Sequence, residues 1–258
     1  MSRKPRLGLI KEVFNVKITN FAKLFDHSVV RPEATREDVL KSIEIVTRLK
    51  TASLIVQPHY IRLVAERLKG SGVLAGTTVG FPHGNETPDM KEYQAKVVME
   101  LGAEEIDMVM NIPALKNGEK ELFIEDIQGV VRAANGAKVK VITENFYLTQ
   151  EEKRCACQWT VLAGAHFVKT ATAFAGGGAT VDDVRLMVEA VDGKCLVKAA
   201  GGIRQVDEIL AYLRAGARRF GSARTDTIVE AFRGLPEDRK AAFGEFLTDL
   251  TIKELEKF

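Results

Sequence analysis

The sequence predicts an α/β fold, a single (β/α)8 TIM barrel that spans residues 1–258 and begins with a helical extension at residues 1–20. Three observations lead to this prediction. Short apolar runs rich in β-branched residues alternate with polar, amphipathic stretches along the whole chain. The apolar runs occur eight times, which is the strand number of such a barrel. No linker rich in Pro, Gly or Ser divides the chain, so its 258 residues suit one domain of this class.

Each apolar run is short enough to form one strand. The carboxyl ends of these strands should meet at one end of the barrel, where barrel enzymes carry their catalytic groups. In chain order, the predicted strands are residues 22–25, 53–56, 74–81, 105–110, 139–143, 167–170, 195–198 and 219–221.

The stretches between the strands predict helices. Residues 36–49 follow Thr35, a favourable N-cap, and place Val39, Ile43 and Val46 at helical spacing. Two later helices also begin after a threonine with acidic residues in the first turn, and glycines follow several of the helices, as is common at helix ends. The further predicted helices are residues 89–101, 120–134, 150–163, 180–191 and 206–215.

An open, doubly wound sheet is the alternative architecture. Such a sheet needs fewer strands, and its first strand-to-helix turn often carries a glycine-rich dinucleotide signature. Here the first predicted strand runs into Asp26-His-Ser-Val-Val-Arg-Pro, which contains no glycine. The sequence therefore favours the barrel.

Composition excludes several classes of partner. The chain has 37 basic and 35 acidic residues, a formal net charge of +2, so neither nucleic acid nor a membrane surface is expected as a partner. No run approaches the roughly 18 apolar residues of a membrane span. A near-neutral chain can still hold a local basic pocket for a small anionic substrate.

The cysteines and the N-terminus indicate where the protein works. Cys155, Cys157 and Cys195 are too few for a disulfide framework, which favours a reducing, cytoplasmic location. The pair Cys155-Ala-Cys157 has no second ligand pair nearby, so no metal site is expected. Residues 1–20 are basic without a continuous apolar core, and we expect a helix packed on the body; a transit peptide is the alternative.

Two lysines lie inside strand-like apolar runs, Lys169 in His-Phe-Val-Lys-Thr-Ala-Thr and Lys198 in Cys-Leu-Val-Lys-Ala-Ala. Strand alternation places each of them, and Asp107 on the fourth strand, on one face of its strand. If these faces point into the barrel, one carboxylate and two amines converge. Desolvation and a second ammonium lower the pKa of a lysine and make it nucleophilic toward carbonyls. A buried Asp–Lys pair that only holds strands together is the alternative.

Several motifs, in order along the chain, make the sequence resemble the deoxyribose-phosphate aldolases. The resemblance runs in register from about residue 20 to 235, nearly the whole chain. The motifs that carry it are residues 26–35, 80–85, 103–111, 167–174 and 197–204.

The resemblance implies a class I aldolase that needs no metal and no cofactor. It implies reversible cleavage of 2-deoxy-D-ribose 5-phosphate, a sugar phosphate, to acetaldehyde and D-glyceraldehyde 3-phosphate. Lys169 would form the Schiff base, Lys198 would stand beside it as an ammonium, and Asp107 would move protons through a bound water. A homo-oligomer, dimer or tetramer, is expected by analogy with the family.

The expected substrate-binding residues lie at the strand ends. Glycines let backbone N–H groups approach a phosphate closely, and the loops after strands seven and eight are the usual phosphate seat of barrels. Arg224 would bind the phosphate with its planar fork or lie free at the surface. The full expected set is Asp26, Thr172, Gly201, Gly202, Ser222 and Arg224.

The departures from the family pattern lie at this phosphate end. Ala171 and Ala173 stand where the family usually has serine and glycine. Alanine restricts a loop that glycine leaves free. These departures keep one alternative open, a related imine-forming lyase whose different substrate need not be phosphorylated. A second alternative, of another class, is a sugar-phosphate-binding protein without catalysis.

Overall fold

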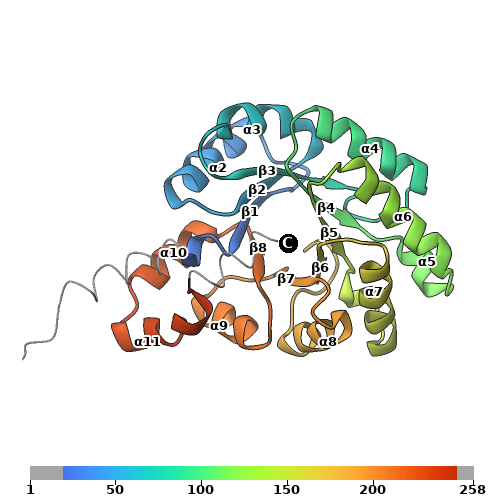
Figure 1. The fold of residues 1–258 in the computed structure, drawn as a ribbon. Coiled ribbons are helices and arrows are strands. Elements are labelled where there is room, and N and C mark those ends of the chain that lie inside the picture. Colours follow the sequence, from blue (N-terminus) through green and yellow to red (C-terminus); the bar gives the residue numbers. More distant parts are fainter. Residues whose placement is uncertain (1–19, 249–258) are drawn as a thin grey trace, which may run out of the picture.

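The computed structural model describes residues 20–248 and shows a closed barrel of eight parallel strands, β1 to β8 in sequence order. Strand β8 pairs with β1 and closes the ring, which helices surround (Figure 1). The predicted barrel is confirmed, whereas the predicted extension falls almost wholly on residues 1–19, outside the described part. The strands are β1 (Phe25–Val29), β2 (Ser53–Val56), β3 (Leu74–Val79), β4 (Glu105–Val109), β5 (Lys138–Ile142), β6 (Phe167–Lys169), β7 (Leu196–Ala200) and β8 (Arg219–Ser222).

One main helix follows each strand. Short helical segments lie in some of the connecting loops and after the last main helix. The main helices are α2 (Arg36–Leu49), α3 (Ile61–Leu68), α4 (Pro88–Glu100), α6 (Lys120–Ala133), α7 (Gln150–Leu162), α8 (Val181–Val191), α9 (Val206–Arg214) and α10 (Thr225–Arg233). The short segments are α5 (Ile112–Lys116), α11 (Glu237–Ala241), and the 3₁₀ turns η1 (Pro58–Tyr60), η2 (Asn145–Tyr147) and η3 (Gly244–Phe246).

Side-chain caps mark the start of two of the helices that the sequence revealed. The side chain of Thr35 accepts a hydrogen bond from the backbone N–H of Asp38 while the Asp38 carboxylate accepts one from the N–H of Thr35, and Thr149 forms the same box with Glu152. Helices α3 and α10, which the sequence analysis did not predict, begin without a capping side chain. Helices α4 and α6 also begin without a capping side chain, yet their apolar spacing was enough to predict them.

The first strand was predicted wrongly, at residues 22–25. Residues 20–22 are helical, and β1 begins at Phe25. The apolar residues before it pack into the outer layer, where the ring of Phe21 stacks on that of Phe232 with centroids 3.9 Å apart. An apolar run looks the same in a sequence whether it enters a sheet or covers one. Asp26 consequently lies within β1 and not at its end.

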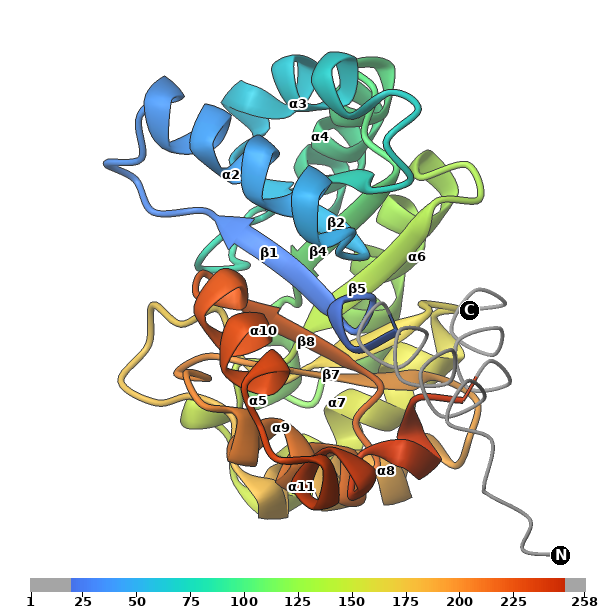
Figure 2. The ribbon, with the colours of Figure 1, turned by 90° about the vertical axis from the view of Figure 1, so that its left-hand side faces the viewer.

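The core consists of an apolar outer layer and a charged interior. Buried aliphatic and aromatic side chains fill the space between the strands and the helices, each contributing about 1.5–3 kcal/mol relative to exposure. Strand alternation sends the other face of each strand into the barrel, where β4, β5, β6 and β7 present acidic and basic side chains. Figure 2 shows β1 crossing the molecule toward the loop that leads into α2.

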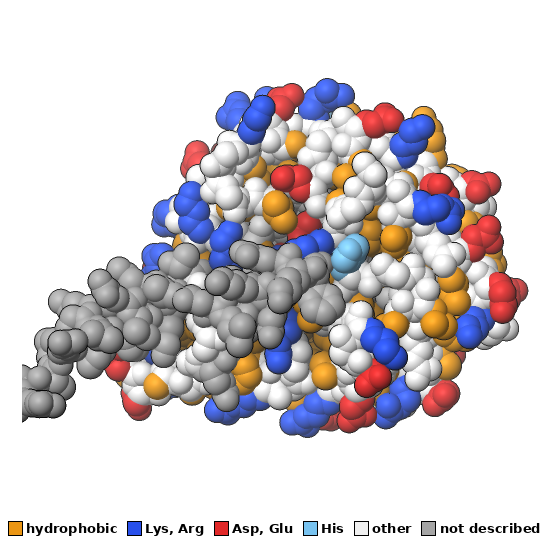
Figure 3. Space-filling view, viewed as in Figure 1, with side chains coloured by type: hydrophobic (Ala, Val, Ile, Leu, Met, Phe, Trp, Pro, Cys, Tyr) orange, Lys and Arg blue, Asp and Glu red, His pale blue; other side chains and the backbone are white. Residues whose placement is uncertain are grey.

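The surface carries both charge signs. On the face seen in Figure 3, acidic and basic side chains are interspersed around the rim and form no broad region of one sign. Among residues 20–248, no helix has the length and apolarity needed to cross a membrane.

Candidate active site

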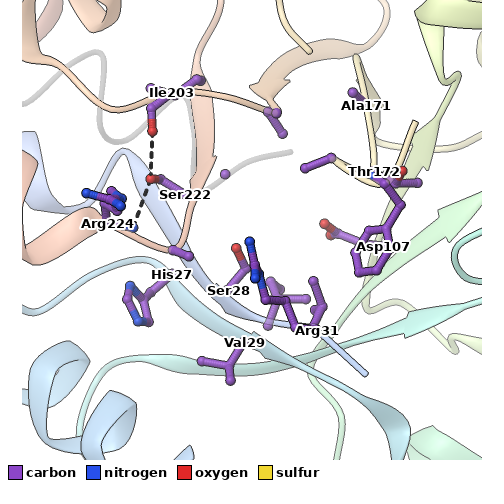
Figure 4. A pocket seen from close by; sticks show the side chains of 18 of the residues that line it. His27, Ser28, Val29, Arg31, Asp107, Ala171, Thr172, Ile203, Ser222 and Arg224 are labelled. Carbon is purple, nitrogen blue, oxygen red and sulfur yellow. Dashed lines mark hydrogen bonds between the residues drawn. The ribbon is translucent and has the colours of Figure 1, made fainter. Parts of the chain in front are cut away.

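A cavity of about 1140 Å³ opens among the loops that follow the strands. Its lining residues come mainly from the carboxyl ends of β1, β6, β7 and β8, the end at which barrel enzymes carry their sites. Asp107 and Thr172 lie at one side of this cavity and Ser222 and Arg224 at the other (Figure 4).

Three charged side chains, from β4, β6 and β7, meet at the cavity. The Nζ atom of Lys169 lies 2.8 Å from Oδ2 of Asp107, and the Nζ atom of Lys198 lies 2.6 Å from the same oxygen. The two lysines are adjacent because Lys169 on β6 and Lys198 on β7 are register partners in the ladder. The side chains that the sequence placed on inward faces therefore do come together.

Burial and charge act together on Lys169, which is 8% exposed. Burial lowers its pKa from the ordinary 10.5 to about 8; Asp107 opposes this change and the ammonium of Lys198 adds to it. Lys198 is 1% exposed and also reaches Oδ2 of Asp26 at 2.5 Å. It thus touches two carboxylates, whereas the Lys169 amine faces the cavity and is close to losing its proton at neutral pH.

Below these residues lies a layer of charges that the sequence analysis did not identify. The Nζ atom of Lys140 lies 2.6 Å from Oε2 of Glu105 and 3.3 Å from Oδ1 of Asp107, and Arg219 lies 2.8 Å from Oδ1 of Asp26. Alternation could have revealed two of them, since Glu105 shares a strand face with Asp107, and Lys140 sits in the apolar part of β5.

Asp26 has a different position from the one expected of a substrate-binding residue. Its carboxylate is fully buried beneath the cavity and does not line it. Ser53, Lys198 and Arg219 all contact its oxygens. Burial alone would raise the pKa of Asp26, but the surrounding cations hold it well below the ordinary value. The structure places Asp26 as an ionised partner of these cations, and its role in substrate binding stays a prediction.

The loops after β7 and β8 form the opposite wall of the cavity. Gly201 and Gly202 have φ values of 94° and 78°, and a Cβ atom on Gly201 would lie 2.9 Å from the Cα atom of Gly178, so glycine is required there. The Ser222 hydroxyl donates to the carbonyl of Ile203 and accepts from the N–H of Arg224 (Figure 4). Both partners of this hydroxyl belong to the protein, so it fixes the turn that presents Arg224.

Comparison with known proteins agrees with this geometry. The family model for DeoC/LacD family aldolases matches residues 20–225. This chain belongs to the DeoC/LacD aldolase family. The chain is 45% identical over 211 residues to a deoxyribose-phosphate aldolase of Staphylococcus epidermidis, covering 82% of this chain and 96% of that protein. The chain is 48% identical over 201 residues to a deoxyribose-phosphate aldolase of Streptococcus gordonii, and the match covers 78% of this chain and 91% of that protein.

Solved structures of deoxyribose-phosphate aldolases also resemble the fold of this DeoC/LacD aldolase. A candidate deoxyribose-phosphate aldolase of Coccidioides immitis superposes with a TM-score of 0.82 at 35% identity, over 84% of this chain and 87% of that one. A tetrameric deoxyribose phosphate aldolase of Aeropyrum pernix superposes with a TM-score of 0.78 at 25% identity, and the match covers 88% of this chain and 99% of that chain.

The loop after β6 of this DeoC/LacD aldolase holds Ala173 at the position where the sequence resemblance predicts a glycine. Ala173 has a φ of 71°, the left-handed conformation that costs an L-residue roughly 1–2 kcal/mol. The backbone N–H and hydroxyl of Thr172 both donate to the buried carboxylate of Glu144, and the N–H of Phe174 donates to the Thr172 hydroxyl. These bonds impose the glycine-like conformation on Ala173. Thr172 thus lines the cavity with its hydroxyl already engaged.

Among residues 20–248 of this family member, no group of three or more His, Cys, Asp or Glu side chains is arranged to hold a metal ion. The Asp107 carboxylate at the cavity is bonded to two lysines, and the Asp26 carboxylate beneath it to an arginine. This set of groups suits imine chemistry on an amine.

Proposed function

We propose that this protein is a class I deoxyribose-phosphate aldolase, a carbon–carbon lyase that reversibly converts 2-deoxy-D-ribose 5-phosphate to acetaldehyde and D-glyceraldehyde 3-phosphate. One observation carries the proposal: the Lys169 amine lies at the cavity beside Asp107, which a second ammonium, Lys198, also contacts. The identities of 45–48% to proteins named deoxyribose-phosphate aldolase support it.

In the first step, Lys169 acts as the nucleophile. Its neutral form, accessible near pH 8, attacks the aldehyde carbon C1 of the open-chain sugar and forms a carbinolamine. Loss of water then gives a protonated imine. Asp107 and Lys198 supply and remove the protons, because both lie within hydrogen-bond reach of one another at the cavity.

In the second step, the imine accepts the electrons of the bond that breaks. As the C3 hydroxyl loses its proton, the C2–C3 bond breaks, its electron pair moves into the iminium group, and glyceraldehyde 3-phosphate leaves. Protonation of the resulting enamine at C2 and addition of water release acetaldehyde and restore Lys169. Asp107 is the general acid/base in our proposal, since it contacts both amines.

The phosphate of the substrate binds, in this proposal, between the loops after β7 and β8. The backbone around Gly201 and Gly202, the first turn of α10 and the Arg224 guanidinium line this side of the cavity. Helix N-termini and arginine forks both favour anions. We place Thr172 and Ser222 in the substrate-binding wall through the loops that their hydroxyls fix.

Borohydride trapping tests the proposal. Incubation with acetaldehyde and cyanoborohydride should add an N-ethyl group to Lys169, located by peptide mass spectrometry, and Lys169→Leu should remain unmodified at that site under identical conditions. A folded protein that releases glyceraldehyde 3-phosphate without any adduct on Lys169 would eliminate the Schiff-base mechanism.

A second candidate function is favoured by the loop after β6. Ala173 fills the position of a glycine expected to offer its N–H to the phosphate, and Ala171 replaces a serine. These changes suit an imine-forming lyase for an unphosphorylated substrate. Turnover of 2-deoxyribose with and without its 5-phosphate separates the two functions: a large preference for the phosphate ester rejects the second candidate.

The proposal also covers the oligomeric state of the protein and its location in the cell. We expect a single-domain enzyme that forms a homo-oligomer, and the tetrameric relative supports this expectation. The cysteines Cys155, Cys157 and Cys195 are free thiols, in keeping with work in a reducing cytoplasm. The expected ligands are the sugar phosphate and acetaldehyde alone, without a cofactor.

A further inference from the structure

The barrel interior contains more cations than carboxylates. The side chains there contact one another within 4 Å in one continuous network, and each is at most 8% exposed. With every group ionised, four cations face three carboxylates, so one positive charge is in excess. The cations are Lys140, Lys169, Lys198 and Arg219, and the carboxylates are Asp26, Glu105 and Asp107.

Lys140 joins the three carboxylates from below. Its ammonium lies 2.6 Å from Glu105, 3.3 Å from Asp107 and 3.4 Å from Asp26. It is fully buried and does not line the cavity, so it cannot touch a substrate. Any effect of Lys140 on the reaction must therefore be electrostatic, through these carboxylates or through the field of its own charge at Lys169.

Lys169 lies at the other end of the same network. In the described part of the chain, Asp107 is the one carboxylate within 4 Å of its amine, and Lys198 and Lys140 contact that carboxylate as well. Lys169 is also the most exposed of the four cations, at 8%. The excess charge is therefore most easily lost there, where the amine is next to the cavity.

The electrostatic environment of the other groups agrees with this assignment. Burial alone would raise the pKa of Asp107, but Lys169, Lys198 and Lys140 hold it below its ordinary value. Burial alone would lower the pKa of Lys140, but Asp26, Glu105 and Asp107 raise it. The strands β2 and β3 add the neutral Ser53 and Thr78 beside Asp26 and Asp107, and Lys138 and His166 lie near the outer side of Glu105.

We propose that Lys140 is a positioning residue for the aldolase reaction: together with Glu105 it sets the charge balance of the barrel interior, and this balance makes Lys169 the amine that gives up its proton. The inference rests on the proposed function, because it assigns the means by which Lys169 becomes a nucleophile. Asp107 cannot neutralise Lys169 fully while it is shared with Lys140 and Lys198.

The test changes the balance in both directions. Lys140→Met leaves three cations and three carboxylates, so the network has no net charge. Glu105→Gln leaves four cations and two carboxylates. The double variant leaves three cations and two carboxylates, again with one cation in excess. Lys91→Met is the matched control, since Lys91 is an equally buried lysine that pairs with Asp126 at 2.7 Å outside this network.

The measurement is the rate of acetaldehyde trapping on Lys169 by cyanoborohydride as a function of pH, with thermal unfolding of each variant as a check of folding. Relative to wild type, Lys140→Met should move the midpoint of the profile to higher pH by at least about one unit, and Glu105→Gln should move it to lower pH. The double variant should return close to wild type, and Lys91→Met should leave the midpoint unchanged.

The outcomes are separable. If wild type itself traps no acetaldehyde on Lys169, the proposed function fails. If wild type is trapped but the two single variants shift the midpoint in the same direction or leave it in place, the charge-balance inference is overturned and the proposed function stands. If Lys140→Met does not fold, two results still test the charge-balance inference. The midpoint of the trapping profile should move to lower pH in Glu105→Gln, and it should return toward the wild-type value in the double variant.

Discussion

The strands and the loops around the cavity differ in how they hold their functional groups. On β4, β6 and β7, the ladder fixes Asp107, Lys169 and Lys198 by backbone pairing, and these are the residues to which the sequence resemblance assigns the chemistry. In the loops after β6 and β8, Ala173 and Arg224 depart from that pattern and are held by local hydrogen bonds. In the proposed function, the strands supply the reacting groups, whereas the loops select the substrate.

The physical reason lies in the number of constraints. A side chain on an inner strand cannot move without breaking ladder bonds on both sides, and replacing it changes the charge of a buried network. A loop residue such as Ala173 depends on a few bonds, chiefly those of Thr172 to Glu144, so its identity can change at a cost of about 1–2 kcal/mol.

The largest effect is expected for Lys169→Leu. It removes the proposed nucleophile, and turnover of deoxyribose 5-phosphate should fall at least roughly 10⁴-fold, as for other nucleophile deletions. A coupled assay for glyceraldehyde 3-phosphate measures it, with Lys91→Met as the control. Residual activity within tenfold of wild type would mean that another group forms the covalent intermediate.

The same variant should be more stable than wild type at neutral pH. The unfolded chain binds more protons than the folded chain between about pH 8 and the ordinary 10.5, so stability rises with pH in this window. Below it, burying the charged Lys169 costs on the order of 3 kcal/mol, which leucine avoids. Urea denaturation at pH 7 and pH 10 should show wild type gaining stability at the higher pH and the variant lacking that gain.

Lys198→Leu is expected to cost about 10²–10⁴-fold in turnover at neutral pH. It removes a proton carrier bonded to Asp107 and the neighbouring ammonium that lowers the pKa of Lys169. The pH profile of imine trapping should therefore also move to higher pH. A loss of turnover without this movement would separate proton transfer from the electrostatic effect.

The pH dependence of the wild-type protein gives an effect of intermediate size. With a pKa of about 8 for Lys169, the neutral fraction of the amine rises about fifty-fold between pH 6 and pH 8. The initial rate of acetaldehyde trapping should rise by a similar factor and then level off. A rate still rising tenfold per unit above pH 9 would show that the amine is not perturbed.

Arg224→Ala tests the loops directly. Loss of one charge-assisted contact should raise the KM for deoxyribose 5-phosphate about tenfold while leaving kcat and the turnover of unphosphorylated deoxyribose unchanged. The two substrates serve as each other's control. An equal loss with both would place Arg224 outside the phosphate site.

Ala173→Gly should have the smallest effect. Glycine adopts a φ of 71° without the steric cost that alanine bears, so the free energy of unfolding should increase by about 1 kcal/mol. Urea denaturation measures it, and Ala171→Gly, at a neighbouring position without a positive φ, should not stabilise the protein. Destabilisation by Ala173→Gly would show that the turn is not strained.

Much of the barrel could be predicted from the sequence because its signals are local. Residues such as Thr35 and Thr149 cap their helices with a neighbour three positions away, and alternation along a strand decides which face Lys169 occupies. The first strand was misplaced because Phe21 and its neighbours are as apolar as a strand, although they pack against Phe232 near the other end of the chain.

The sequence by itself determined the fold class, the resemblance to the aldolase family and the alternation that puts each of the two lysines on one face of its strand. Only the tertiary structure decided that Asp26 lies beneath the cavity and that Lys140, Glu105 and Arg219 join the same network. The reason is physical: the pKa of a buried group depends on every charge within a few ångströms, and these charges come from β1, β4, β5, β7 and β8, which only the closure of the barrel brings together.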